Sequence, residues 1–478
     1  MMESFKKSRG KFALSAATLL VLSGCAGVSL EQSLSRTNEE AASFTGGKLA
    51  LAQTAEERES RQKAASGLLA APLGQNEAVQ LALANSPALQ ALLAQHGADT
   101  ARSAQAGRLP NPVFGFERLR TGDELELSRV LSFGLLDLLT LPLRQGLAER
   151  QVEQARLRLT ADVVERVTEV RQAWVRAVSA RQTLQFAQQV YESAEAGAEL
   201  ARRMQSVGNI NKLDRARQQA FYADAATQLA AARHAATASR EELVRLLGLN
   251  EAQTRDLKLP ERLSDLPKQP LQPVEVGQAA SRGRLDVRLA QAELEAAARA
   301  RGLTNVTSVT DIELGAIRNT TFDNAEGSRT TGRGYEISLR LPLFDWGELQ
   351  RDAANGQALA AAHRLEATLH AAGSSLRESY SAYRTAYDIA RHHRDEVVPL
   401  RKTISEENQL RYNAMLIGVF ELLADSRDQV TTVMAAIAAE QQFWLADAAL
   451  QASLIGRPTL SAVAPVAGAR AGGGDAAH

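Results

Sequence analysis

Histidine and carboxylate side chains stand together in one short run, His392–Glu396. The run reads His-His-Arg-Asp-Glu, and imidazoles and carboxylates are ordinary ligands of zinc and other divalent ions. Adjacent positions of a helix point about 100° apart, because one turn holds 3.6 residues, so neighbours in this run do not face one ion together. His363 and His370 share a helix face, but about 10 Å of helix rise separates them. We therefore expect no metal site at these histidines.

The residue patterns that support catalysis do not occur in this sequence. It contains no glycine-rich phosphate loop, no GxSxG elbow and no Cys/His spacing typical of zinc sites. Lysine plus arginine and aspartate plus glutamate both number 55, so the chain has no net field that would attract nucleic acid. We expect no enzymatic activity, no cofactor and no nucleic-acid partner. A hydrolytic enzyme is the function that the sequence supports least.

The single cysteine, Cys25, is the one side chain for which the sequence indicates a specific reaction. Four basic residues between Lys6 and Lys11 precede an apolar run, 12–22, which is too short to span a bilayer. Residues 1–24 therefore read as an export signal peptide, and their end, Leu-Ser-Gly before Cys25, resembles the lipobox of bacterial lipoproteins. That resemblance implies cleavage before Cys25 and acylation, which anchors a protein firmly because each buried methylene contributes about 0.8 kcal/mol. Ala26 is not the aspartate that retains lipoproteins in the inner membrane, so the outer membrane is the expected destination.

The rest of the chain divides into two similar halves. Residues 25–74 have no sustained apolar period, and we expect an acylated N-terminal tether that is flexible or loosely docked. The halves, 75–258 and 274–456, repeat each other at an offset of about 207 residues, which indicates duplication of a whole unit. A proline-rich linker, 259–273, separates them. For residues 457–478, which are rich in glycine and alanine, we expect a disordered tail.

Each half shows the order helix, two strands, long helix, turn and helix. The strands are clearest in the second half, where apolar residues alternate with polar ones along 335–343. A period of two is typical of a strand with one apolar face. We expect its partner at 311–318, with Ile312 on the apolar side and Arg318 among the polar remainder. A long polar loop, 319–334, would join these two strands.

In the first half, the alternation along 124–133 predicts a strand opposite 111–119. The chain thus offers about four strands, each apolar on one face and polar on the other. In an outer membrane the apolar face can contact lipid while the polar face lines a wet lumen. Four strands cannot close a barrel, which needs about eight, and an open edge in lipid is prohibitive. Several chains must therefore share one barrel, and three copies would give twelve strands.

The helices are expected to be unusually long. Residues 143–205 contain no proline, and apolar residues recur there at steps of three or four, so one continuous helix would be roughly 95 Å long. In the second half, leucines and tyrosines along 365–387 form an approximate heptad seam with alanines between them. We expect Pro399 to bend or break this second long helix.

Several of these features together resemble the TolC-type outer membrane efflux proteins. They are the lipobox, the duplicated unit, the strand-to-helix passage "LRLPLFDWGELQRD" and the two helical hairpins around Gly208 and Met415. The resemblance covers about residues 75–456. It implies a mainly α fold with a small β part and internal duplication. Three chains, with four strands each, would build a twelve-stranded transmembrane β-barrel that a long periplasmic α-helical barrel continues.

The same resemblance implies a function and partners. Members of this family are homotrimers that act as outer-membrane exit ducts of tripartite efflux systems. They conduct substrates passively, and a periplasmic adaptor (a membrane fusion protein) and an inner-membrane RND-type transporter deliver those substrates. The lipid on Cys25 and the surrounding outer-membrane lipid would be the other partners, with no cofactor.

The resemblance places adaptor docking at the two helical turns, which would form the periplasmic tips. Gly208 suits the positive backbone dihedral that a tight turn requires, whereas Met415 stands where glycine is usual. Two ordinary helical hairpins without a docking role are the alternative reading. The docking residues would be Arg203, Ser206, Val207, Gly208, Asn209, Ile210 and Lys212 at the first tip, and Arg411, Tyr412, Met415, Leu416, Ile417 and Gly418 at the second.

A periplasmic gate is the last site that the resemblance implies. Six residues past each turn, Asp214 and Glu421 occupy positions where the family often places lumen-facing carboxylates, which three chains would gather into rings. Arg217, Arg411 and Asp425 are candidate partners that hold such a gate shut. Solvated surface carboxylates are the plainer alternative.

Two functions of other classes stay open on the residues alone. A lipid-anchored periplasmic adaptor would need a lipoyl-like β-domain around a single hairpin, whereas this chain shows two hairpins and a duplication. An anchored coiled-coil scaffold without a pore would leave the alternating strands unexplained.

Overall fold

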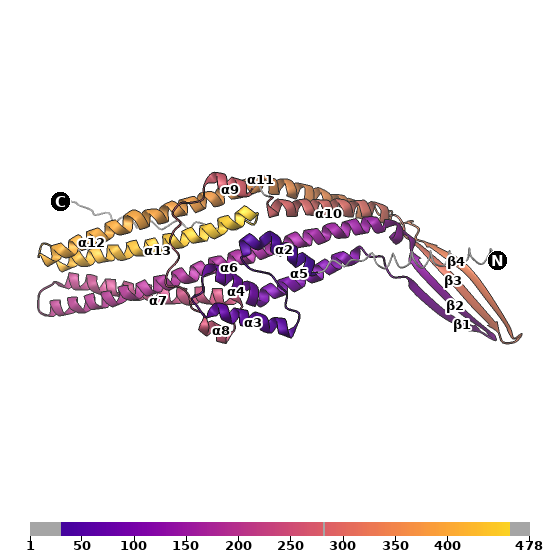
Figure 1. The fold of residues 1–478 in the computed structure, drawn as a ribbon, viewed down its shortest axis with the longest axis horizontal. Helices are drawn as coiled ribbons and strands as arrows, with labels where there is room; N and C mark the ends of the chain where they lie inside the picture. Colours follow the sequence, from indigo (N-terminus) through magenta and orange to yellow (C-terminus); the bar gives the residue numbers. More distant parts are fainter. Residues whose placement is uncertain (1–29, 281–282, 459–478) are drawn as a thin grey trace, which may run out of the picture. The chain divides into compact units, whose positions relative to one another are not determined.

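The structure, a computed structural model, describes residues 30–280 and 283–458. The fold is mainly helical with one small sheet, as predicted (Figure 1). The predicted signal peptide, Cys25 and nearly all of the predicted tail lie outside the described residues. The chain forms two compact units. Unit 1 contains the N-terminal residues to Thr37, Gln95–Arg156 and Gln291–His363, and unit 2 contains Asn38–Ala94, Leu157–Ala290 and the residues from Arg364 onward.

Both halves follow the predicted order of helix, two strands, long helix, turn and helix. The first half, with the segment before it, contains α2 Leu30–Thr45, α3 Ala55–Leu69, α4 Gln75–Asn85, α5 Pro87–Ala106, α6 Leu135–Ser206, α7 Lys212–Leu247 and α8 Glu251–Asp256. The second half contains α9 Pro273–Ala280, α10 Leu285–Thr307, α11 Glu348–His392, the π-helical turn η1 His393–Val397, α12 Val398–Asn413 and α13 Val419–Ile455.

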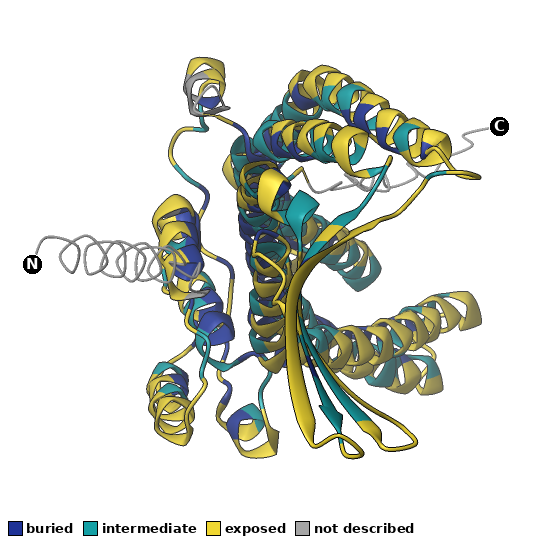
Figure 2. Ribbon diagram, turned by 90° about the vertical axis from the view of Figure 1, so that its right-hand side faces the viewer, coloured by how far each residue is buried: buried dark blue, intermediate teal, exposed yellow. Residues whose placement is uncertain are grey.

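A single antiparallel sheet forms the β part of unit 1. Its four strands follow one another in chain order, so β2 of the first half pairs with β3 of the second half. Figure 2 shows the sheet as a curved layer whose outer strands are exposed. Both outer strands have one unpaired edge within the described chain. The strands are β1 Val113–Thr121, β2 Glu124–Gly134, β3 Ile312–Asp323 and β4 Ser328–Leu339.

The second hairpin is longer than predicted. Residues 319–334, predicted as a polar loop, are mostly strand, and only 324–327 connect β3 to β4. The prediction is wrong because the threonines, glycines and asparagine there carry no apolar alternation, although their backbones pair along both whole strands. Arg318, predicted on the polar side, shares a face with Ile312, since both occupy even positions of β3.

The passage from β4 to α11 begins earlier than predicted. Leu341 and Leu343, predicted as strand residues, follow the end of β4. Gly347 then adopts a φ of 73°, and a Cβ on it would lie 2.4 Å from the carbonyl oxygen of Ser308. Arg351 donates to the Ser308 hydroxyl at 3.0 Å and fixes the start of α11 against the end of α10. The glycine is therefore required by both conformation and space.

The long helix of the first half is confirmed. Helix α6 contains 72 residues and tolerates Pro142 near its start. Most of its predicted apolar positions in unit 2 are buried, with Val164, Val170 and Ala173 fully enclosed. Trp174 in the same stripe donates its indole N–H to the carbonyl oxygen of Leu73 at 2.8 Å, which satisfies the one polar group of a buried ring.

The long helix of the second half is interrupted, as Pro399 led us to expect. A proline has no N–H to donate, and its ring crowds the carbonyl one turn earlier. The chain forms the π-helical turn η1 directly before it, and Val398 donates to the carbonyl of His393, five residues back. One extra residue in the turn thus accommodates the proline.

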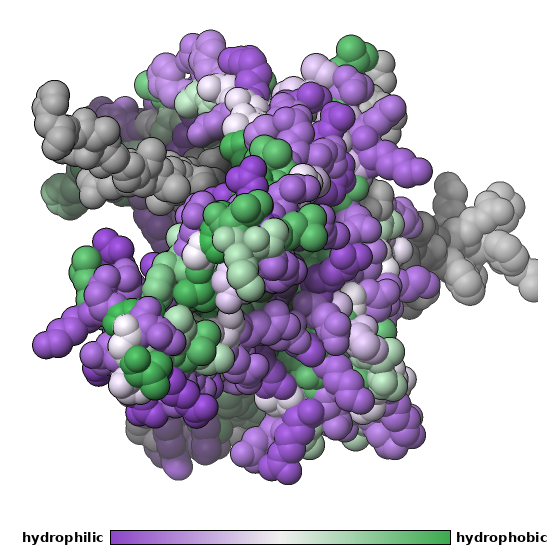
Figure 3. Space-filling view, turned by 90° about the vertical axis from the view of Figure 1, so that its left-hand side faces the viewer, coloured by the Kyte–Doolittle hydropathy of each residue, from purple (hydrophilic) through white to green (hydrophobic). Residues whose placement is uncertain are grey.

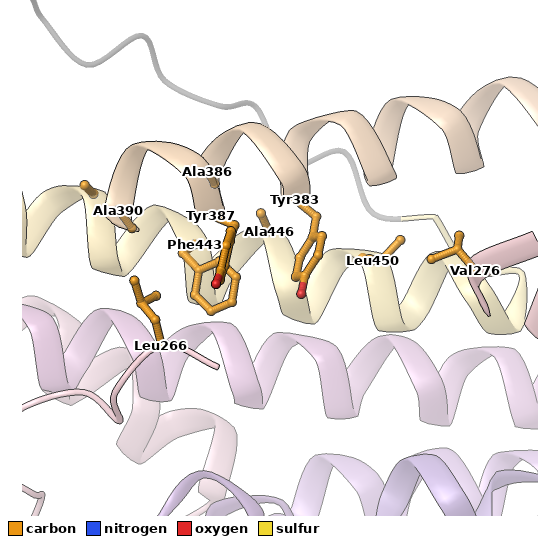
Figure 4. Packing of buried hydrophobic residues seen from close by; sticks show 10 residues of the cluster. Leu266, Val276, Tyr383, Ala386, Tyr387, Ala390, Phe443, Ala446 and Leu450 are labelled. Atoms are coloured by element: carbon orange, nitrogen blue, oxygen red, sulfur yellow. The ribbon is translucent and has the colours of Figure 1, made fainter. Parts of the chain in front are cut away.

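The linker between the halves packs tightly on the second half. Tyr387 donates its hydroxyl to the carbonyls of Pro267 at 3.1 Å and Lys268 at 3.2 Å. Tyr380 donates to the carbonyl of Leu271 at 3.2 Å. Tyr383 and Tyr387 pack against Phe443 of α13 in one apolar cluster (Figure 4). The predicted seam is thus correct at its tyrosine end, whereas Leu369 on the same helix is 53% exposed.

The segment before the first half differs from the loosely docked tether that we expected. Its described part contains α2 and α3, and Leu34, Phe44 and Leu69 are buried. In unit 2, the side chain of Asn38 pairs with both backbone groups of Leu49, at 2.7 and 3.0 Å. Specific polar contacts hold this segment in place. A search for apolar periodicity does not detect them.

Within the described ranges, every helix is too short or too polar to cross a lipid bilayer.

Asp447 on α13 is a largely covered ionisable group of unit 2. Burial raises its pKa to about 6, while a hydrogen bond from the Gln451 side chain and the charge of Arg171 act in the opposite direction. The ionised carboxylate is therefore disfavoured in the folded state.

Replacing Tyr387 by phenylalanine should destabilise unit 2 by about 1–2 kcal/mol, because the part-buried hydrogen bonds to two linker carbonyl groups are lost. Denaturant unfolding of the purified protein measures this change. Tyr412→Phe, at an exposed position, is the matched control and should change little. Equal stability of the two variants would contradict the packed role of the linker.

Asp447→Asn should stabilise the protein at pH 7.5 by on the order of 2 kcal/mol and leave it unchanged near pH 4. The folded pKa lies above the unfolded one, so the wild type loses stability as the pH rises from about 4 to about 6. Thermal unfolding at both pH values tests this, with Asp224→Asn at an exposed position as the control. A parallel pH profile for Asp447→Asn and wild type would refute the assignment.

Candidate functional site

The first helical turn ends α6 with a close left-handed motif. Gly208 has a φ of 80°, its N–H donates to the carbonyl of Gln205 at 3.1 Å, and the N–H of Asn209 donates to that of Met204 at 2.9 Å. This pair of bonds is the Schellman arrangement, in which a left-handed residue satisfies the last carbonyls of a helix. The predicted role of Gly208 in the turn is confirmed.

The second turn has the same geometry with a different residue. Met415 has a φ of 59°, and it is the one non-glycine residue with a positive φ among the described residues. Its N–H donates to the carbonyl of Tyr412 at 2.9 Å, and the N–H of Leu416 donates to that of Arg411 at 2.8 Å. Methionine therefore occupies the left-handed position itself, and the turn is not displaced toward Gly418.

The two turns also differ in how the next helix begins. Asn211 caps α7, since its side-chain oxygen accepts from the backbone N–H of Asp214 at 2.8 Å. Gly418 occupies the equivalent place before α13 and provides no side-chain cap. The first turn thus combines glycine at the bend with a capped helix, and the second combines a strained bend with an uncapped helix.

Both turns lie at the same end of unit 2 and carry exposed apolar side chains (Figures 1 and 3). Val207 is 70% exposed in the first turn, and Met415 and Leu416 are 92% and 75% exposed in the second. Figure 3 shows hydrophobic patches within a hydrophilic surround when the molecule is seen from this end. Such side chains on a short turn form a contact surface that the chain itself does not cover.

The polar side chains at the first turn are engaged with their own helix. Arg203 donates to Glu199 at 2.8 Å, and the Ser206 hydroxyl donates to the carbonyl of Arg203 at 2.7 Å. Hydrogen bonds from Arg203 and Arg202 lower the pKa of Glu199. The turn continues through Asn209 and Ile210 to Lys212, the first residue of α7, whose side chain is exposed. Arg203 therefore points to solvent with a partner already bound.

The predicted gate residue of the first half, Asp214, pairs with one of the partners expected for it. Asp214 forms an ion pair with Arg217 at 3.4 Å, one turn farther along α7. The arginine is mostly exposed, whereas the carboxylate is largely covered. A pair so close to solvent contributes little to stability.

In the second half the carboxylates are arranged differently. Glu421 is exposed, while Asp425 is buried and lies 3.6 Å from Arg401 of α12. Arg401 also pairs with Asp428 at 2.5 Å. The cation beside Asp425 is thus Arg401, which is not among the gate partners expected from the sequence, Arg217, Arg411 and Asp425. Within the described chain, Oδ2 of Asp425 has no hydrogen-bond partner, so the pair leaves one buried acceptor unsatisfied.

A contact that the sequence reasoning missed joins the two hairpins of unit 2. Arg427 of α13 donates to Gln218 of α7 at 3.1 Å, and its guanidinium lies 4.7 Å from the centre of the Phe221 ring. Gln218 and Asp425 are both buried and are 207 positions apart, as are the two left-handed residues of the turns. Alignment of the two halves at that offset would have drawn attention to both.

Among the described residues, no group of three or more histidine, cysteine, aspartate and glutamate side chains could hold a metal ion. His392 instead pairs with Glu396 at 3.3 Å, one turn away on the helix surface.

The second half of the chain matches a known family. Residues 276–456 match the outer membrane efflux protein family. This region is an outer membrane efflux protein domain. The efflux protein domain includes β3, β4, the second helical turn and the cluster around Phe443. No curated protein matches the chain.

Solved structures share the fold over both halves. One is a membrane protein from Pseudomonas aeruginosa, with 20% identity and a TM-score of 0.66 over 80% of this chain and 93% of that one. VceC, an outer membrane protein of Vibrio cholerae, has 16% identity and a TM-score of 0.65 over 80% of this chain and 96% of that one. The open state of MtrE, an outer membrane channel of Neisseria gonorrhoeae, has 18% identity and a TM-score of 0.65 over 80% of this chain and 90% of that one. The efflux protein domain thus belongs to a chain that shares the fold of these structures over about 80% of its length.

Met415→Gly should stabilise the protein by about 0.5–1 kcal/mol, because a left-handed conformation costs a non-glycine residue roughly 1–2 kcal/mol and glycine then loses more chain entropy on folding. Met415→Ala keeps the strain and is the control. Gly208→Ala introduces the same strain into the first turn and should destabilise it by a similar amount. Denaturant midpoints compare the three variants, and a destabilised Met415→Gly would contradict this account of the turn.

Proposed function

We propose that this protein is the outer-membrane exit duct of a tripartite efflux system and conducts substrates passively from the periplasm to the outside. An efflux protein domain in the second half and the fold of outer membrane channels over both halves support the proposal. Without a nucleotide-binding motif in the sequence, the energy for transport has to come from an inner-membrane transporter of the RND type.

The observation that carries the proposal is the open sheet. One of its faces is apolar in the rows nearest the helices. Its outer strands β1 and β4 each leave a row of backbone groups unpaired within the described chain. In lipid every backbone polar group needs a partner, so an open edge is tolerated only when another chain pairs with it. The β4 edge of one copy can pair with the β1 edge of the next. Three copies close a twelve-stranded barrel.

The two turns are the docking surface for the periplasmic adaptor. Their apolar side chains are exposed in the single chain, and their backbones are fixed by hydrogen bonds within the turns. A rigid turn with an apolar surface suits helical hairpins of a partner that meet it end to end. Acylation at Cys25 would hold the protein in the outer membrane from the periplasmic side.

The gate is formed by Asp214 and Glu421 in each copy, which three chains bring together as rings. Asp214 is already paired with Arg217, and Asp425 with Arg401. The ion pair of Asp425 with Arg401 joins α12 to α13, and the hydrogen bond from Arg427 to Gln218 joins the two hairpins, so a force on the hairpins from the adaptor would act on these contacts. Opening then means a shift of the hairpins that separates the rings.

Arg203→Glu or Gly208→Trp should abolish efflux while the trimer and its membrane insertion stay intact. The first change reverses a charge beside the turn, and the second places a large side chain at a left-handed position. Susceptibility to exported compounds in a strain that lacks the duct measures efflux, and the heat-stable oligomer on gels measures assembly. Arg233→Glu, on the exposed surface of α7 and away from the turn, is the matched control. Unchanged resistance in both turn variants would count against docking at this site.

A further inference from the structure

The two faces of the sheet carry opposite charges. Strand pairing aligns alternate residues of the four strands into rows, so each residue can be assigned to one of two faces. The first, the arginine face, carries every arginine of the sheet and no acid. Its basic residues are Arg118, Arg120, Arg129, Arg318, Arg329 and Arg333.

The second, the acidic face, carries every acid of the strands and no basic residue. It also contains all the glycines of the strands. Gly315 on this face is buried, and a Cβ there would lie 3.4 Å from Val130 and 3.6 Å from Glu336, so neighbouring side chains cover its backbone closely. The acids are Glu117, Glu124, Glu126, Glu313, Asp323 and Glu336.

The arginines occupy only one part of their face. They lie in the three rows nearest the turns that connect the strands of each hairpin. Three of them, Arg129, Arg318 and Arg333, are direct neighbours in one row. The three rows on the side of the helices are entirely apolar, with Phe114, Leu131, Phe133, Ile312, Leu314, Ala316, Tyr335, Ile337 and Leu339. The face thus changes from apolar to basic between two successive rows.

The charges of these arginines are not balanced by the chain. Within residues 30–280 and 283–458, no salt bridge is formed by any of the six, and Arg329 contacts the Phe322 ring of its own face at 5.3 Å. By contrast, Arg340, just beyond β4, pairs with Asp311 at 3.7 Å. The six side chains are exposed except for Arg129, which is partly covered.

Such a row needs an anion. Neighbouring strands are about 4.8 Å apart, so the three guanidinium groups in one row repel one another unless a negative group lies between them. The planar fork of arginine donates two parallel hydrogen bonds to a phosphate, which suits it to this task better than lysine. A phosphate that bridges two strands would satisfy neighbouring arginines together.

We propose that the arginine face binds the phosphate groups of membrane lipids, with the acyl chains on the apolar rows below. The inference rests on the proposed function, in which the turns of the strand hairpins reach the outer surface of the membrane. The occupant is a lipid and not a soluble anion, because the basic rows continue directly into an apolar band of the same face. One amphipathic molecule matches both parts.

The arrangement also assigns roles to the two faces in assembly. Anionic headgroups around the barrel neutralise the basic belt, while the acids line the lumen away from them. Charge complementarity thereby fixes the height of the sheet in the membrane, since the boundary between apolar and basic rows coincides with the boundary between acyl chains and headgroups.

The test uses full-length protein reconstituted in vesicles of equal parts phosphatidylglycerol and phosphatidylcholine. Native mass spectrometry after extraction counts the lipids that stay bound. We expect wild type to retain phosphatidylglycerol preferentially, and the triple variant Arg129→Gln, Arg318→Gln and Arg333→Gln to lose that preference by roughly 10-fold or more. Replacement of the same residues by lysine should keep part of it, because the charge stays and the fork is lost.

A matched control changes three charges on the other face, with Glu117→Gln, Glu126→Gln and Glu336→Gln. It should not lower the preference for phosphatidylglycerol. A glutamine variant of the arginine face that assembles and conducts but keeps the wild-type preference overturns this inference and leaves the proposed function standing. Displacement of the lipid by an equal concentration of inorganic phosphate identifies a general anion site and also overturns it. Wild type that does not enter the vesicles at all overturns the proposed function.

Discussion

The structure depends on one constraint, which is that a sheet with an apolar face and two open edges is not a stable end state for a single chain. The strands β1 and β4 each present one row of unpaired backbone groups within the described chain. Water could satisfy those groups but would also meet the apolar rows. Lipid covers the apolar rows but leaves the edges unsatisfied. The pairing between copies that we propose would remove both costs and close the sheets into one wall.

The internal duplication supplies the proposed wall with two equivalent units in each chain. Each half supplies a β-hairpin and a helical hairpin, and the pairing of β2 with β3 joins the halves into one sheet. The helical turns are equivalent at an offset of 207 positions, since Gly208 and Met415 take the same left-handed place. They have diverged in side chains while keeping the backbone. Gln218 and Asp425 also occupy equivalent buried positions with different side chains. Gln218 is a neutral amide, whereas Asp425 is a carboxylate paired with Arg401.

Much of the fold was predictable because the spacing of apolar residues along the sequence indicates which face of a helix or strand is buried. The strand along 124–133 and the helix over 143–205 show clear periods of 2 and 3.6, and both are present. The same reasoning failed for 319–334, where threonine and glycine form a strand without apolar contrast. It failed for the segment before the first half as well. There, the Asn38 side chain holds the chain through hydrogen bonds to the backbone of Leu49, 11 residues farther along the same segment.

The site was predictable to a smaller extent. The turn at Gly208 was clear from glycine at a helix end, and the partner of Asp214 lies one turn away in sequence. Arg401, the partner of Asp425, comes from another helix, and no local pattern connects the two. The basic and acidic faces of the sheet required the register of all four strands, which sequence alternation alone did not provide.

Native mass spectrometry of the protein extracted from outer membranes tests the central claim most directly. Closure through identical edges predicts a single species with the mass of three mature chains that survives in detergent. A species with the mass of one chain, stable and soluble without detergent, would contradict the claim that the sheet is completed by its own copies.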